Sequence, residues 1–175
     1  MSDLSNFSLT DLVKGIKKKD FTSLEITKTF VNNSENSTKL NAYITKCFDE
    51  AIIYAKNFDK KKDYKGLLPG IPIAVKDLFC TKNVKTTAGS KILHNFVPTY
   101  ESTVTKKLWS EGAFLLGKLN CDEFAMGSSN ETSFFGNVTN PFGDKLVPGG
   151  SSGGSASALA SNLTPVTVGT DTGGS

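Results

Sequence analysis

Apolar positions in the first third of the chain recur three and four residues apart, which is the spacing of an amphipathic helix. Capping-box sequences at residues 8–11 and 22–25 open two such stretches, because a serine or threonine is followed three residues later by an acid. A third stretch covers residues 48–62 and ends in three lysines at 60–62. The pattern predicts three helices, and the lysine run indicates a solvated helix end rather than a binding patch.

Shorter apolar runs, bounded by turn residues, have the length and composition of strands. The predicted strands are residues 40–45, 71–75, 113–117 and 165–169. The last is β-branched and is expected to be buried. Further helical signals lie at 101–111 and 155–161, with a brief helical turn at 121–126. Helix and strand signals alternate without internal repeats, so the sequence predicts an α/β fold with a mixed or parallel sheet.

Composition narrows the function classes. The chain has 175 residues, of which 38% are hydrophobic, so one globular domain can bury a core. It has 20 basic residues against 17 acidic ones, and every basic residue is lysine. The net charge of +3 is too small to argue for nucleic-acid binding by itself. Without arginine there is also no guanidinium fork to read phosphate or guanine.

The three cysteines, Cys47, Cys80 and Cys121, are widely spaced and never form a C-x-x-C pair. This is the pattern of neither a disulfide framework nor a zinc site, and it fits a reducing compartment. The first residues lack a basic region followed by an apolar run, and no segment approaches 18 apolar residues. We therefore expect a cytoplasmic protein with no membrane partner.

Two serines in the last part of the chain are framed by glycines. Ser151 lies in the block GGSSGG at 149–154, and Ser175 closes the sequence DTGGS at 171–175. Glycine admits backbone conformations closed to other residues, so both serines are expected on tight, exposed turns that suit reactive groups. A flexible Gly/Ser linker is the alternative, but a linker would not enclose the helix and strand predicted between the two blocks.

The candidate base for these serines is a lysine. Residues 149–153 satisfy the G-x-S-x-G pattern of serine hydrolases, in which a histidine follows the nucleophile. The only histidine in the sequence, His94, lies far upstream in a polar loop and is expected to be an ordinary surface residue. Lys76 follows the predicted strand 71–75, where burial would favour the neutral amine that accepts a proton. On position alone, however, a strand-end lysine is usually a solvent-exposed side chain.

Three segments together resemble the amidase signature family. They are GIPIAVKD at 70–77, GGSSGGS at 149–155 and GTDTGGS at 169–175. The resemblance implies the amidase signature fold, an α/β fold with a mixed β-sheet covered by helices, and a Ser-cisSer-Lys triad. Carried over by position, Lys76 would be the base, Ser151 the bridging serine held through a cis peptide, and Ser175 the acylated nucleophile. The oxyanion hole would be formed by the backbone amides of Thr172, Gly173, Gly174 and Ser175.

Within that family, residues 117–136 are similar to the A subunits of bacterial and organellar glutamyl-tRNA(Gln) amidotransferases. The likeness implies a glutaminase that hydrolyses glutamine and passes ammonia to a partner in a heterotrimer. The partner would bind misacylated Glu-tRNA(Gln) and use ATP with Mg²⁺ to convert it to Gln-tRNA(Gln). This chain itself would bind no cofactor.

The family's fold continues past the nucleophilic serine, whereas this sequence ends on it. We therefore expect residues 1–175 to be the N-terminal portion of a single amidase signature domain, incomplete at the C-terminus and inactive alone. Two other interpretations stay open. One is a stand-alone amidase that acts on another carboxamide, and the other is a non-catalytic remnant that only binds a partner.

Overall fold

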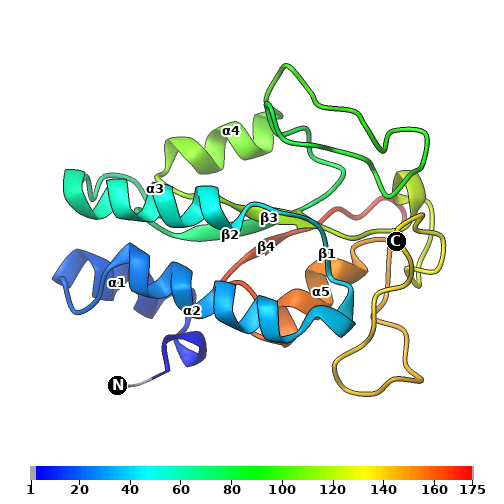
Figure 1. Cartoon of the computed structure of the whole chain (residues 1–175), viewed down its shortest axis with the longest axis horizontal. Helices are drawn as coiled ribbons and strands as arrows, with labels where there is room; N and C mark the ends of the chain where they lie inside the picture. The colour runs from blue at the N-terminus through cyan, green and yellow to red at the C-terminus, as the bar shows by residue number, and fades with distance from the viewer. Residues whose placement is uncertain (1–2, 175) are drawn as a thin grey trace.

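The helices predicted in the first third of the chain are present. The computed structural model describes residues 3–174 and begins with the short 3-10 helix η1 (Leu4–Asn6). Helices α1 (Leu9–Lys18), α2 (Ser23–Asn36) and α3 (Phe48–Lys61) follow, drawn in blue and cyan in Figure 1. The lysines at 60–62 are exposed at the end of α3, which confirms the solvated helix end.

The two capping-box predictions differ in outcome. At the start of α2, the Thr22 hydroxyl accepts from Glu25 N at 3.1 Å, and the Glu25 carboxylate accepts from Thr22 N at 2.7 Å, which is a complete box. At the start of α1, the Ser8 hydroxyl accepts from Asp11 N at 3.2 Å but also donates to the Asp11 carboxylate at 2.6 Å. The shorter aspartate side chain is held by the serine hydroxyl, so this box is only half formed.

Within residues 3–174 the strands form one mixed sheet, which confirms the predicted fold class. They are β1 (Tyr43–Lys46), β2 (Pro72–Lys76), β3 (Phe114–Leu119) and β4 (Thr167–Val168). Their order across the sheet is β1-β3-β2-β4. Strand β2 is parallel to both of its neighbours, β3 and β4, whereas β1 is antiparallel to β3. Helices lie above and below the strands in Figure 1, as the family resemblance implies.

Two strand predictions are corrected by the structure. The pattern predicts one strand at 40–45, but the 3-10 helix η2 (Thr38–Leu40) and the left-handed conformation of Asn41 (φ 52°) delay β1 to Tyr43. The strand predicted at 165–169 is present, but the predicted length and burial are wrong, because β4 has two residues and both are half-buried. Among the described residues β4 pairs only with β2, so no neighbouring strand covers its other edge.

The later helices are α4 (Thr103–Ser110), the single turn η3 (Glu123–Ala125) and α5 (Gly153–Ala160). Ser102 caps α4 by accepting from Thr105 N at 3.2 Å. Helix α5 begins two residues before the predicted start, because Gly154 packs directly on the chain after β3. Its N–H donates to Asn120 O at 3.0 Å, and a Cβ at this position would overlap that carbonyl.

Two buried apolar clusters meet at β2. The larger cluster joins α1, α2 and α3 to the sheet and includes Ile73 and Val75. The smaller cluster contains Ala74 together with Ala158 of α5, the helix drawn in orange beneath the strands in Figure 1. Successive side chains of a strand point to opposite faces, so Lys76 points to the same face as Ala74. The sheet therefore directs Lys76 toward α5 and the glycine-rich turn that precedes it.

Across residues 3–174, every helix falls short of the length or the apolar content that crossing a membrane requires.

Candidate active site

Lys76, the last residue of β2, is fully buried. Its Nζ lies 2.6 Å from Ser151 Oγ, 3.0 Å from Ser152 Oγ and 2.7 Å from Thr170 Oγ1. The two serines belong to the turn before α5, and the threonine follows β4. The lysine amine is therefore enclosed by hydroxyl groups, and the alternative of a solvent-exposed strand-end lysine is wrong.

The direction of one of these hydrogen bonds is fixed by the backbone. The Ser152 hydroxyl donates to the Thr170 carbonyl at 3.0 Å and accepts from Thr170 N at 3.1 Å. Because its only proton is already used, Ser152 can only accept from Lys76. A neutral amine has two N–H groups and one lone pair. If Thr170 accepts the second N–H, the lone pair faces Ser151, which is the arrangement needed to take a proton from that serine.

Burial lowers the pKa of the Lys76 amine below its ordinary value. The negative charges of Asp122 and Asp171 act in the opposite direction, because a nearby anion favours the ammonium form. Within residues 3–174 the amine forms its hydrogen bonds with hydroxyl groups, and neither carboxylate is a hydrogen-bond partner. The predicted desolvation of Lys76 is confirmed, and the amine has an environment suited to a base.

Ser151 is fully buried, so the expectation of an exposed turn is wrong for this serine. The Gly150–Ser151 peptide bond is cis, as the family resemblance implies. Close packing explains the error, because only glycine fits at position 150, where a Cβ would overlap Asp122 Oδ2. The loop after β3 is thereby able to cover the turn and leave the Ser151 hydroxyl facing Lys76.

The segment predicted to form the oxyanion hole is exposed from Asp171 to Gly174. Gly173 (φ 77°) and Gly174 (φ 92°) adopt left-handed conformations that favour glycine. The Gly174 N–H donates to the Asp171 carboxylate at 2.7 Å, so it would have to leave that partner to bind an oxyanion. Thr172, the first residue of the predicted oxyanion hole, lies in the same exposed segment. Ser175, the predicted nucleophile, lies outside the described residues.

The sequence motifs do not single out Ser152 or Thr170 as partners of Lys76. Both lie inside the segments that carry the family resemblance, but a motif does not say which of several adjacent hydroxyls faces the amine. The register offers a signal for Thr170. It follows a strand parallel to β2, and the carboxyl ends of parallel strands meet at one edge of the sheet.

His94 is exposed, as expected, and its Nδ1 lies 2.7 Å from the carbonyl oxygen of Lys91. It is therefore a surface residue and takes no part in the group around Lys76. In the part of the chain that the structure describes, no three histidine, cysteine or acidic side chains are grouped so that they could hold a metal ion.

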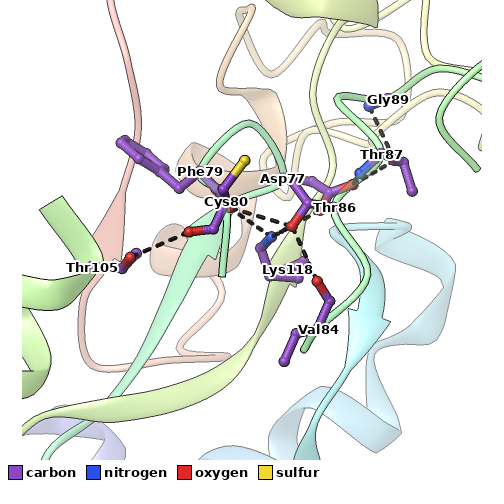
Figure 2. A network of polar contacts seen from close by, with 9 residues as sticks. All are labelled: Asp77, Phe79, Cys80, Val84, Thr86, Thr87, Gly89, Thr105 and Lys118. Atoms are coloured by element: carbon purple, nitrogen blue, oxygen red, sulfur yellow. Dashed lines mark hydrogen bonds and ion pairs between the residues drawn. The ribbon is translucent and has the colours of Figure 1, made fainter. Parts of the chain in front are cut away.

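A second buried lysine forms an ion pair in the network of Figure 2. Lys118 Nζ lies 3.2 Å from Asp77 Oδ1 and donates to Phe79 O at 2.9 Å and to Thr86 Oγ1 at 2.7 Å. Both charged side chains are fully buried. The other oxygen of Asp77 accepts from the backbone N–H of Thr87 at 2.9 Å and from its hydroxyl. This network fastens the segment after β2 to the end of the sheet.

The comparison with known families covers most of the chain. The sequence profile of the family Amidase matches residues 25–175. The A subunit of the glutamyl-tRNA(Gln) amidotransferase of Pelagibacter ubique is 68% identical over 175 residues, which are 100% of this chain and 36% of that protein. The chain thus spans a little over a third of the length of this curated relative.

Solved structures agree with this comparison. A structure of fatty acid amide hydrolase has a TM-score of 0.91 at 28% identity, covering 98% of this chain and 31% of that one. The A subunit of the Thermotoga maritima glutamyl-tRNA(Gln) amidotransferase has a TM-score of 0.75 at 30% identity, covering 94% and 34% respectively. Because the family profile and the fold agree over nearly the whole sequence, this chain belongs to the amidase signature family.

Proposed function

We propose that this chain is the N-terminal portion of a glutamine-hydrolysing A subunit of a glutamyl-tRNA(Gln) amidotransferase, and that residues 1–175 belong to a single amidase domain. The buried contact of 2.6 Å between Lys76 Nζ and Ser151 Oγ carries the proposal of amide hydrolysis. The identity of 68% to the Pelagibacter protein over the whole chain supports glutamine as the amide. An enzyme on another carboxamide, or a remnant that only binds a partner, would have to differ from that relative in function.

In the proposed reaction, the Ser175 hydroxyl attacks the side-chain carboxamide carbon of glutamine. A C–O bond forms, and the carbonyl electron pair moves to oxygen. The proton of Ser175 passes to Ser151 while Ser151 gives its own proton to neutral Lys76. Backbone N–H groups of the turn at 172–175 would stabilise the oxyanion, which requires the Gly174 N–H to leave Asp171.

Collapse of the tetrahedral intermediate breaks the C–N bond. The proton held by Lys76 returns through Ser151 to the leaving nitrogen, so ammonia departs and a glutamyl ester remains on Ser175. Water then attacks the ester and passes a proton through Ser151 to Lys76. This proton returns to the Ser175 oxygen as glutamate leaves. Lys76 begins and ends each half-reaction neutral, the state that its burial favours.

The remaining steps belong to partner proteins in this proposal. Ammonia would pass to a second component of a heterotrimer, which binds the misacylated Glu-tRNA(Gln). ATP and Mg²⁺ would be bound there to activate the glutamyl group, and this chain would hold no cofactor. Such a complex would act in the cytoplasm, where the charged tRNA is formed and used.

The test is glutamine hydrolysis by the full-length protein in complex with its partners. Ammonia release should rise when ATP and Glu-tRNA(Gln) are added, and Gln-tRNA(Gln) should form. Ser151→Ala and Ser175→Ala should each abolish ammonia release. Ser110→Ala, at the exposed end of α4, is a matched control that should leave it unchanged.

Two results would overturn the proposal. Hydrolysis of other carboxamides with no response to ATP and tRNA would favour a stand-alone amidase. Complex formation with no ammonia release from any amide would favour the non-catalytic remnant.

A further inference from the structure

Asp122, three residues after β3, is a fully buried carboxylate that forms no ion pair with another described residue. Its Oδ2 accepts from Asn130 N at 2.9 Å. Its Oδ1 accepts from Thr132 N at 3.2 Å and from Thr132 Oγ1 at 2.9 Å. A buried charge is unfavourable unless hydrogen bonds compensate it, so these three donors must stay in place around the carboxylate. Asp122 therefore organises the loop at 130–132.

The same residue is attached to the serine turn by its backbone and by its side chain. The N–H of Asp122 donates to Ser151 O at 3.1 Å. Its carboxylate lies so close to Gly127 and Gly150 that a Cβ at either position would overlap it. Gly150 directly precedes Ser151, so a change in the size or hydration of the carboxylate would displace the bridging serine.

Asp122 is also a buried anion whose charge acts on the Lys76 amine. The acidic groups whose charges act on the amine are Cys121, Asp122 and Asp171. Burial raises the pKa of Cys121 to about 12, so its thiol is uncharged at neutral pH. Asp171 is exposed, and water and salt screen its charge. The carboxylate of Asp122 is not screened in this way, since it is enclosed by protein.

We propose that Asp122 is a positioning residue: it holds the Gly150–Ser151 turn against Lys76, and its negative charge favours transfer of the Ser151 proton to the lysine. The inference rests on the proposed function, because it assigns Asp122 a part in the proton transfer from Ser151 to Lys76. It adds a residue that neither touches the glutamine nor exchanges a proton, but sets the distance and the charge on which the transfer depends.

The experiment replaces Asp122 by asparagine in the full-length protein in complex with its partners. Asp122→Asn keeps the size but removes the charge and turns one acceptor into a donor that faces an N–H group. We expect kcat for glutamine hydrolysis to fall on the order of 100-fold, as for a displaced catalytic group, with a much smaller change in KM. Without the anion, the pKa of Lys76 falls further, so the acid limb of the kcat–pH profile should move to lower pH.

Two further variants separate position from charge. Glu131→Gln removes the same charge from an exposed position one residue before Thr132 and should leave both kcat and the acid limb unchanged. Thr132→Val removes one donor to Asp122, together with the acceptor of the Glu123 N–H, but keeps the charge, and Thr132 is exposed, so this variant should fold. It should lower kcat by several-fold with the acid limb unmoved. If Asp122→Asn fails to assemble, Thr132→Val decides: a fall in kcat supports the proposal, and an unchanged kcat overturns it.

An Asp122→Asn protein that assembles and keeps the wild-type pH profile contradicts the proposal, even if its melting temperature is lower. That outcome leaves the proposed function standing, provided that Ser151→Ala remains inactive. If Ser151→Ala hydrolyses glutamine at the wild-type rate, the proposed function itself fails. The two failures are therefore distinguishable in one set of assays.

Discussion

Two fully buried lysines, Lys76 and Lys118, lie on neighbouring strands of one sheet and have opposite surroundings. Lys118 pairs with Val75, the residue before Lys76, so the two side chains point to opposite faces. On one face the amine is bonded to three hydroxyl groups. On the other it meets the carboxylate of Asp77, a carbonyl and a hydroxyl (Figure 2).

The difference lies in which protonation state each site can satisfy. Burial lowers the pKa of both lysines, but for Lys118 the charge of Asp77 and its hydrogen bond act against that shift. The three N–H groups of an ammonium match the three acceptors around Lys118, one of which is anionic. Hydroxyl groups can donate as well as accept, so the site of Lys76 can also hold a neutral amine. Burial alone does not make a lysine a base, because the polar groups bonded to the amine decide which protonation state is stable.

Removing the amine of Lys76 should have the largest effect, a loss of catalysis that is not expected to depend on protein stability. Lys76→Met keeps the aliphatic stem but removes the amine, and it should lower glutamine hydrolysis by the full-length protein on the order of 10⁴-fold or more, because nucleophile and base act as a unit. Its free energy of unfolding should fall by only about 1–3 kcal/mol, because the buried Ser151 hydroxyl loses its partner but no ion pair is broken. Ammonia release and urea unfolding measure the two quantities. If the variant kept more than about one per cent of the wild-type rate of glutamine hydrolysis, Lys76 would be excluded as the base.

The same substitution at the other lysine should cause a larger loss of stability. Lys118→Met leaves Asp77 as a buried carboxylate without its cation, so the free energy of unfolding should fall by about 3–5 kcal/mol. Urea unfolding measures the loss. The double variant Lys118→Met/Asp77→Asn removes both charges and should recover most of it, because a buried pair replaced as a whole is often neutral. If the double variant loses as much stability as Lys118→Met and Asp77→Asn lose together, the two side chains are not coupled. Lys118 would then not be a lysine held by an ion pair, and the contrast with Lys76 would not hold.

The sequence singles out Lys76 as a site residue, but it gives no signal for the ion pair of Lys118. The apolar strand before Lys76 and the two glycine-framed serine motifs carry a family resemblance, and that resemblance implies a base at Lys76 and a bridging serine at Ser151. Lys118 also ends an apolar run, but its partner Asp77 is distant in the chain, and only the parallel pairing of β2 with β3 brings the two together. Such long-range contacts have no signature in a local pattern.

At the site, the wrong prediction is the exposure of Ser151, and it comes from the role of glycine in the turn around this serine. In a sequence, glycine suggests an exposed turn, yet at Gly150 and Gly154 it permits close approach of Asp122 and Asn120, which bury the serine. The same ambiguity hides Asp122, because a carboxylate in a loop usually faces solvent. The helices and the fold class follow from local periodicity and Lys76 follows from the family resemblance, whereas the packing of one loop on another follows from neither.

A smaller effect tests whether the hydroxyl groups direct the lone pair of Lys76. Thr170→Val keeps the shape of the side chain and removes one acceptor of the amine. We expect kcat to fall about tenfold, which corresponds to one lost hydrogen bond in the transition state. Thr170→Ser keeps the hydroxyl and is the matched control. Equal rates in the valine and serine variants would mean that this hydroxyl does not orient the base.

The smallest effect is the pH dependence of stability, and it tests the protonation state without catalysis. The pKa of Lys76 is lower in the folded than in the unfolded chain, so the unfolded chain binds a proton first as the pH falls below the ordinary lysine value of 10.5. This lysine's contribution to stability is therefore complete above pH 10.5 and is lost as the pH falls through its folded value, by at most about 1.4 kcal/mol per pH unit.

In Lys76→Met this pH-dependent contribution is absent. Lys118 and the other charged groups are present in both proteins, so their contributions cancel when the two unfolding free energies are subtracted. The unfolding free energy of wild type minus that of Lys76→Met should thus increase as the pH is raised toward 10.5, and it should be flat below the folded pKa of Lys76. Urea unfolding at a series of pH values measures it. A difference that stays constant over the whole alkaline range would mean that the pKa of Lys76 is the same in the folded and the unfolded chain, and the hydroxyl surroundings would then not favour the neutral amine.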